Sequence, residues 1–345
     1  MDRFTYSDVY IPKAEKKPLT FFETHREEII SLYSLADIDG ELPDDITDPM
    51  VIHDYSLSRW MKGDHWNPDN KYAYSVEQSD LEEFYQILDR LQLREEIIPP
   101  AGTVIDELVI VGSTFSANFR RASLGKQLID SGQVSFRENP NISIWAGQRP
   151  SYASEEIDFD GFLGAGYSDV HDVFKDETDM ANFVVHTLWG MAENGKLLLP
   201  DPAGIYLPEP AVEGDMLSAQ LEDIPPLSEL GVRDFAQYEY LLPRNNHTIK
   251  ILNARAVERR QGEPRHTTES SAREWLALNN IPVGYTVLEI NGNPHAYRIN
   301  SEIKRVFTEC GRPDIKVVSA AIAARQDSPP SLYLGEIGRI LFNNY

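Results

Sequence analysis

Three turns in this 345-residue chain combine small residues, hydroxyls and cations, a composition suited to binding an anion. The first is Gly112-Ser-Thr-Phe-Ser-Ala-Asn-Phe-Arg-Arg121, where small residues let backbone N–H groups approach a ligand at a helix start. Ser113, Thr114 and Asn118 can add side-chain hydrogen bonds. The spacing is neither that of a GxGxxG nor that of a Walker loop. This turn therefore predicts a ligand site without naming the ligand, and a plain strand-to-helix turn is the alternative.

The second turn, Arg265-His-Thr-Thr-Glu-Ser270, lies before an apolar helical pattern. Thr267 or Thr268 is a suitable N-cap for that helix, which is the purely structural interpretation. Arg265 and His266, just upstream, would also favour a bound anion at the helix start.

The third turn is Asn293-Pro-His-Ala-Tyr-Arg298. Asn293 fits an N-cap and Pro294 the first helical position, which places His295 in the first turn and Arg298 one turn on. A cation in the first turn works against the helix dipole. Two cations there are better explained by an anion that binds between them.

These turns follow the strands of a predicted sheet. The apolar run Leu108 to Val111 is rich in β-branched residues, which indicates a strand buried on both faces. Further strand patterns at 142–146, 248–253, 285–290 and 315–320 alternate with helical ones. Such alternation predicts a three-layer Rossmann-like α/β fold with a parallel sheet. Ligands in that fold bind at the carboxyl ends of the strands, so the three turns are predicted to share one pocket with Gly147 and Arg149.

Two stretches lie outside this alternation. Residues 1–102 are acidic and aromatic and predict a mostly helical N-terminal cap on a Rossmann-like domain of residues 103–345. Residues 151–245 contain acidic and proline-rich passages and predict an insertion in that domain. Trp60, His65 and Trp66 are interpreted either as an aromatic lid over a ligand or as packing within the cap. The acidic stretch from His171 to Asp179 could bind a divalent cation, but an exposed acidic loop is the preferred interpretation, and no metal site is predicted.

Composition limits the classes of partner. The formal net charge of −23 argues against nucleic acid and anionic membranes, because phosphate binding needs clustered cations. Cys310 is the only cysteine, which excludes an intramolecular disulfide and a cysteine-rich zinc site. No stretch approaches the ~20 apolar residues of a membrane span, and the start lacks the apolar core of a signal peptide. A cytoplasmic protein is therefore expected. The sequence does not indicate an oligomeric state.

The order of these motifs resembles the DUF218 family, also called YdcF-like, of bacterial Rossmann-like proteins. Asn293-Pro-His295-Ala-Tyr-Arg298 is similar to the family's His-x-x-Arg after its penultimate strand, and Arg265-His-Thr267-Thr268 to the Thr-rich turn before it. Glu177 is similar in position to the family's acidic residue. The resemblance covers residues 105–320, and the first turn lacks the family's pair of glycines. It implies a Rossmann-like fold and a nucleotide-like or phosphate-bearing ligand, with S-adenosylmethionine among the candidates.

Two classes of function remain open. In the first, the protein is a hydrolase or transferase acting on a small anionic metabolite. His295 would be the acid or base, while Arg265 and Arg298 would hold the anion. In the second, it is a non-catalytic ligand-binding or interaction module that uses its acidic aromatic cap and its insertion. Missing HExxH and GxSxG motifs favour the second class. The cations at a helix start favour the enzyme, which is the preferred hypothesis.

Overall fold

The computed structural model describes residues 20–37, 40–60, 76–147, 176–185, 188–189, 237–242, 247–254 and 266–343. The chain divides into two compact units. Unit 1 comprises Met1–Glu95, Asn293–Arg312 and Ala323–Tyr345, and unit 2 comprises Glu96–Gly292 and Pro313–Ile322. Two segments that follow the predicted boundary at residue 102 therefore group with the N-terminal helices.

A six-stranded sheet of order β5-β6-β4-β2-β7-β8 forms the centre of unit 2. Five of its strands are parallel: β2 (Glu107–Val111), β4 (Asn141–Gly147), β6 (His247–Ala254), β7 (Thr286–Gly292) and β8 (Lys316–Ile322). These are the five strands that the sequence predicts, and the fold is Rossmann-like α/β. The edge strand β5 (Gln237–Leu242) runs antiparallel to β6 and lies within the segment predicted as an insertion.

The strand order places a topological switch point in the middle of the sheet. The first long strand, β2, pairs with β4 on one side and with β7 on the other. The chain adds β4 and then β6 in one direction, and returns to add β7 and then β8 in the opposite direction. Ligands of doubly wound sheets bind where the order reverses, which here is the carboxyl end of β2 and β7.

Helices cover both faces of this sheet. On one face lie α5 (Phe115–Asp130) and α7 (Glu177–Val185), which share an apolar core with Ile110, Ile144 and Ile290. Side chains alternate along a strand, so Trp145 faces the other side. There its ring lies 5.8 Å from Trp275 of α8 (Thr268–Leu278), which packs on β4 and β6. A smaller parallel pair, β1 (Thr103–Ile105) and β3 (Val134–Phe136), completes the strands described in unit 2.

A buried carboxylate accepts hydrogen bonds from several elements at the amino end of the sheet. Glu107, the first residue of β2, is fully buried and accepts hydrogen bonds from Ser143, from the Trp275 indole at 3.0 Å and from the Tyr285 hydroxyl at 2.9 Å. Burial and the adjacent carboxylate raise the pKa of Tyr285 well above its ordinary value. With this many donors, Glu107 stabilises the fold at the end of the sheet opposite the switch point.

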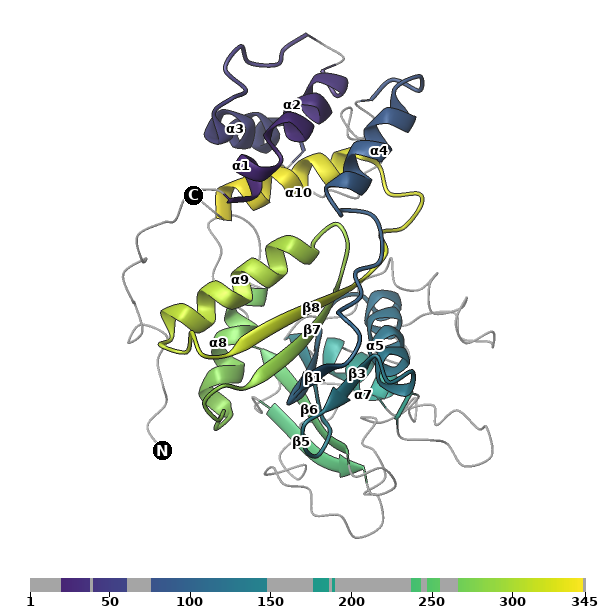
Figure 1. Cartoon of the computed structure of the whole chain (residues 1–345), viewed down its shortest axis with the longest axis vertical. Helices are drawn as coiled ribbons and strands as arrows, with labels where there is room; N and C mark the ends of the chain where they lie inside the picture. The colour runs from purple at the N-terminus through teal and green to yellow at the C-terminus, as the bar shows by residue number, and fades with distance from the viewer. Residues whose placement is uncertain are drawn as a thin grey trace. The chain divides into compact units, whose positions relative to one another are not determined.

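The regular secondary structure described in unit 1 is all helical. It contains α1 (Thr20–Thr24), α2 (Arg26–Leu35), α3 (Pro49–Arg59), α4 (Leu81–Arg90), α9 (Ala296–Glu309) and α10 (Pro330–Asn343). The apolar helix α10 packs against α1, α3 and α9 (Figure 1). Tyr33 donates a hydrogen bond to the carbonyl of Leu334 at 3.0 Å, and Trp60 is buried against Tyr33 and Tyr55. Trp60 thus belongs to the core of this unit, while His65 and Trp66 lie outside the described residues.

No helix in the described part of the chain combines the length and the apolar character that crossing a membrane requires.

Candidate functional site

Two side chains of α5 hold the turn that follows β2. Arg121 Nη1 donates to the carbonyls of Val111 at 2.5 Å and Gly112 at 3.1 Å, and Asn118 Nδ2 donates to that of Ser113 at 3.0 Å. Three successive carbonyls are therefore fixed by the helix that the turn introduces. The N-cap residue, Thr114, makes no side-chain capping hydrogen bond, so capping does not use its hydroxyl.

Arg121 lies at the topological switch point and is only 5% exposed. A Cβ atom added to Gly292, the last residue of β7, would lie 3.5 Å from Arg121 Nη2. Burial lowers the pKa of Arg121 to about 10, and the buried carboxylates of Glu177 and Glu289 act in the opposite direction. Arg121 therefore stays protonated at neutral pH and places a positive charge at the end of β2 and β7.

Two polar atoms of α5 at this point have no hydrogen-bond partner within the described residues. They are Arg121 Nε and Asn118 Oδ1, and each belongs to a side chain at least nine-tenths buried. Buried polar atoms are normally satisfied by protein, water or a ligand. A donor and an acceptor at the carboxyl end of the sheet thus mark a place for a small polar molecule.

The carboxylate of Glu177 packs against the glycines at the ends of β2 and β4. The interpretation of the acidic stretch from His171 to Asp179 as an exposed loop is wrong at its end, because Glu177 begins α7 and is buried together with the two residues that follow it. The Glu177 Oε2 atom accepts a hydrogen bond from the N–H of Gly147 at 3.1 Å and lies 3.4 Å from His266 Nε2. A Cβ atom at Gly112 would clash with the Glu177 Oε1 atom. The imidazole of His266 occupies the corresponding position at Gly147. Both glycines are therefore needed for protein groups to pack against them.

This packing decides where a phosphate can bind. In dinucleotide-binding folds, a glycine after the first strand lets the backbone approach the pyrophosphate. Here that space at Gly112 is filled by the carbonyl oxygen of Trp145 and by Glu177, whose charge would also repel a phosphate. A pyrophosphate does not fit over Gly112. Among the described residues at this edge, the start of α5, from Thr114 onward, suits an anion.

Gly112→Ala is expected to lower the free energy of unfolding by about 1–3 kcal/mol, because the new methyl group meets a strand carbonyl that cannot move away. Urea denaturation measures the change. Gly125→Ala is the matched control, since its methyl group would meet only side-chain ends of Leu108 and Ile290, at 2.9 Å. In α5 the higher helix propensity of alanine offsets ~1 kcal/mol of that strain. Equal costs for the two variants would contradict the packing described at Gly112.

The second predicted turn caps α8. Thr267 is the N-cap: its hydroxyl accepts from the N–H of Ser270 at 3.1 Å, and the Ser270 hydroxyl accepts from the N–H of Thr267 at 2.8 Å. This reciprocal capping box confirms Thr267 as the cap and makes Thr268 the first helical residue. It also fixes His266 beside Glu177. Arg149 and Arg265 lie outside the described residues.

The third predicted turn begins its helix later than expected. The N-cap of α9 is His295, so the prediction of Asn293 as N-cap and Pro294 as first helical residue is wrong. Asn293 instead donates hydrogen bonds to the carbonyls of Gln92 at 3.0 Å and Glu95 at 2.6 Å. These bonds use the amide that the prediction assigned to the helix start, and the Asn293–Pro294 peptide is cis.

An internal carboxylate binds both cations of this turn. Arg298 Nε donates to Glu336 Oε1 at 2.6 Å and Arg298 Nη1 to Glu302 at 3.0 Å, while His295 Nδ1 lies 2.8 Å from Glu336 Oε2. Glu336 is fully buried. Burial would raise its pKa, but Arg298 and His295 outweigh burial and hold the pKa of Glu336 well below its ordinary value. Within unit 1, the anion predicted between these two side chains is therefore the carboxylate of Glu336 on α10.

The predicted site residues therefore fall into two groups. Gly112, Ser113, Thr114, Asn118, Arg121, Gly147, Thr267 and Thr268 belong to unit 2, around the carboxyl edge of the sheet, and Asn293, His295 and Arg298 belong to unit 1. The assignment of His295, Arg298 and Arg265 to catalysis stays a prediction. Glu289 and Asn291 were not predicted. Their signal is a pair of polar residues at alternate positions of an otherwise apolar strand, Leu288-Glu-Ile-Asn291.

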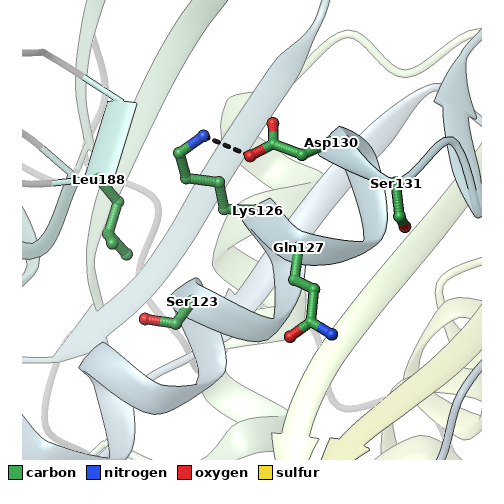
Figure 2. A pocket seen from close by; sticks show the side chains of 6 residues that line it. All are labelled: Ser123, Lys126, Gln127, Asp130, Ser131 and Leu188. Carbon is green, nitrogen blue, oxygen red and sulfur yellow. Dashed lines mark hydrogen bonds and ion pairs between the residues drawn. The ribbon is translucent and has the colours of Figure 1, made fainter.

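A hollow on the outer face of α5 is a weaker candidate. Figure 2 shows its lining, which consists of Ser123, Lys126, Gln127, Asp130, Ser131 and Leu188. Lys126 and Asp130 pair with each other at 2.6 Å and are partly exposed. This hollow lies along the second half of the helix, away from the start that faces the switch point. In the described ranges, no cluster of His, Cys, Asp or Glu could hold a metal ion.

Comparisons with protein-family models, with curated proteins and with solved structures give no match to this chain. What defines its class is therefore the geometry: a Rossmann-like α/β unit with a buried arginine at the switch point.

Proposed function

We propose that the chain is an enzyme, a hydrolase or transferase, that binds a small phosphate-bearing or nucleotide-like molecule at the carboxyl ends of its parallel sheet. The observation that carries this proposal is Arg121. It is a buried, protonated guanidinium at the topological switch point, and its Nε is unsatisfied in the described residues. A cation in that position attracts an anionic ligand to the place where doubly wound sheets bind theirs.

The start of α5 supplies the remaining contacts of the proposed site. The helix has 16 residues, so its first N–H groups carry the positive end of a full dipole. The Thr114 hydroxyl is not used for capping, and Asn118 Oδ1 is unsatisfied. The resemblance to the DUF218 family implies the same ligand class, with S-adenosylmethionine as a further candidate. A non-catalytic ligand-binding module would use this site too, but Glu177 and His266 beside it favour an enzyme.

Thr114→Val is expected to weaken binding of a phosphate-bearing ligand about tenfold, the loss of one charge-assisted hydrogen bond, without changing the stability of the free protein. Thermal-shift titration with AMP, glucose 6-phosphate and S-adenosylmethionine measures both quantities, because a bound ligand raises the melting temperature. Ser123→Ala, a lost hydroxyl on the outer face of α5, is the matched control and should bind as the wild type does. An absent shift at millimolar ligand, or equal affinities for the two variants, contradicts the proposal.

A further inference from the structure

We infer that His266 and Glu177 are the acid–base pair of the proposed site, with His266 as the catalytic residue and Glu177 as the residue that positions it. This inference rests on the proposed function, because it assigns a reaction step to the same edge of the sheet. It adds two residues that the sequence motifs left outside the predicted catalytic set.

Hydrogen bonds of the neighbouring backbone and side chains position both residues of the pair. Glu177 is the first residue of α7, and its neighbour Thr178 donates a hydrogen bond to Asn253 at the end of β6, at 3.3 Å. The carboxylate is also fixed by the N–H of Gly147. His266 is held by the capping box that begins at Thr267. Their orientation is therefore set by three elements that start or end at the carboxyl edge of the sheet.

Burial distinguishes the pair from a surface contact. The side chain of Glu177 is fully buried and that of His266 is 14% exposed. A carboxylate in such surroundings stabilises a neighbouring imidazolium more strongly than it would in water. The partial exposure of His266 leaves it a route to a ligand, while Glu177 has none to solvent. The histidine is therefore the member suited to exchange protons.

The described charged groups on the surrounding elements agree with this assignment. Glu177 faces His266 from α7, Gly147 of β4 brings no charge, and on α8 Glu269 is paired with Arg273 at 3.0 Å. Arg121 of α5 lies within electrostatic range of Glu177. An ionised Glu177 then favours the protonated form of His266.

The step that this arrangement supports is a proton transfer around phosphoryl transfer. His266 takes the proton of an attacking water or ligand hydroxyl as its oxygen bonds to phosphorus. The bond from phosphorus to the leaving oxygen breaks, and His266 returns the proton to that oxygen. Between the two transfers, Glu177 stabilises the imidazolium. Such general acid–base catalysis contributes typically about 10²–10⁴-fold in rate.

The pair is tested in the ligand-free full chain by NMR titration of its histidine side chains, with the His266 signal assigned from His266→Gln. In Glu177→Gln, the titration midpoint of His266 should fall by about one pH unit or more, because a nearby opposite charge is removed. Gly147→Ala alters no titratable group but places a methyl group where the imidazole lies, and should also lower the midpoint. An unchanged midpoint in both folded variants overturns the inference, whether or not the protein binds a phosphate-bearing ligand.

Catalysis is tested separately with p-nitrophenyl phosphate over pH 5–9. His266→Gln should lower kcat/KM about 10²-fold or more. Glu177→Gln should shift the acidic limb of the pH profile to lower pH, as it shifts the titration midpoint of His266. Wild-type turnover that is unaffected by His266→Gln overturns the catalytic role. Absence of any turnover by the wild type counts against the proposed function with this phosphoester and against the catalytic step, while the NMR result still decides the pairing.

Discussion

Glu336→Gln is expected to lower the free energy of unfolding by about 3–5 kcal/mol, the cost of breaking a buried ion pair from one side. Glu336 is fully buried, and Arg298 and His295 both contact its carboxylate. A neutral amide removes this negative charge, and the desolvated guanidinium of Arg298 loses one of its two carboxylate partners. Burial lowers the pKa of Arg298, but Glu336 and Glu302 outweigh burial and raise it, which shows how strongly the cation depends on these carboxylates.

Urea denaturation at pH 7 gives this cost, with Asp327→Asn as the control. Asp327 also pairs with an arginine of unit 1, Arg325 at 3.1 Å, but its side chain is 71% exposed, and its loss should cost under ~1 kcal/mol. The pH dependence supplies a second check. The pKa of Glu336 is lowered in the folded state, so its contribution is fully present above the ordinary value of 4.5 and is lost below it. The difference in the free energy of unfolding between the wild type and Glu336→Gln should therefore become smaller below that pH. A constant difference, or a cost no larger than the control's, would show that Glu336 does not bind these cations.

The sheet could be predicted from the sequence because its central strands are almost entirely buried. Every residue of β2 and β7 is buried, and such strands are rich in apolar, β-branched residues and are bounded by turn residues. The edge strand β5 was not predicted, since Gln237-Tyr-Glu-Tyr240 mixes polar and aromatic residues in a segment interpreted as an insertion. An edge strand pairs on one side only, and its pattern is correspondingly weaker.

The sequence predicted the position of the turns better than the partners of their side chains. Small residues after β2 located the turn, and the N-cap at Thr267 followed from local hydrogen-bonding rules. The partners of the polar side chains in the third turn lie far away in the sequence, and no local pattern indicates them. Arg298 meets Glu336, 38 residues away, and Asn293 bonds to carbonyls about 200 positions earlier in the chain. Similarly, glycine composition suggested room for a ligand, whereas Glu177 and His266 fill the space over Gly112 and Gly147.

Arg121→Met is expected to destabilise unit 2 by about 3–5 kcal/mol, because the side chain lies within electrostatic range of two buried carboxylates and binds two carbonyls. Methionine preserves much of the apolar volume but supplies neither charge nor donors. Glu177 and Glu289 would then lose one nearby positive charge, and the carbonyls of Val111 and Gly112 would lose their side-chain donor. The turn that begins the proposed site would be the first element to loosen.

Lys126→Met is the matched control, a lost cation on the same helix. Lys126 pairs with Asp130 on the partly exposed outer face of α5 (Figure 2), and such pairs contribute under ~1 kcal/mol. The loss of stability in Arg121→Lys should lie between those of Arg121→Met and Lys126→Met, since lysine keeps the charge but cannot reproduce the forked donors of a guanidinium. Urea denaturation from pH 5 to 8 adds a test of sign. Protonation of a carboxyl relieves the excess negative charge in Arg121→Met, so the folded variant takes up protons and its loss of stability should shrink as the pH falls. A loss of stability that is the same at every pH would mean that Arg121 acts only through its hydrogen bonds to the turn.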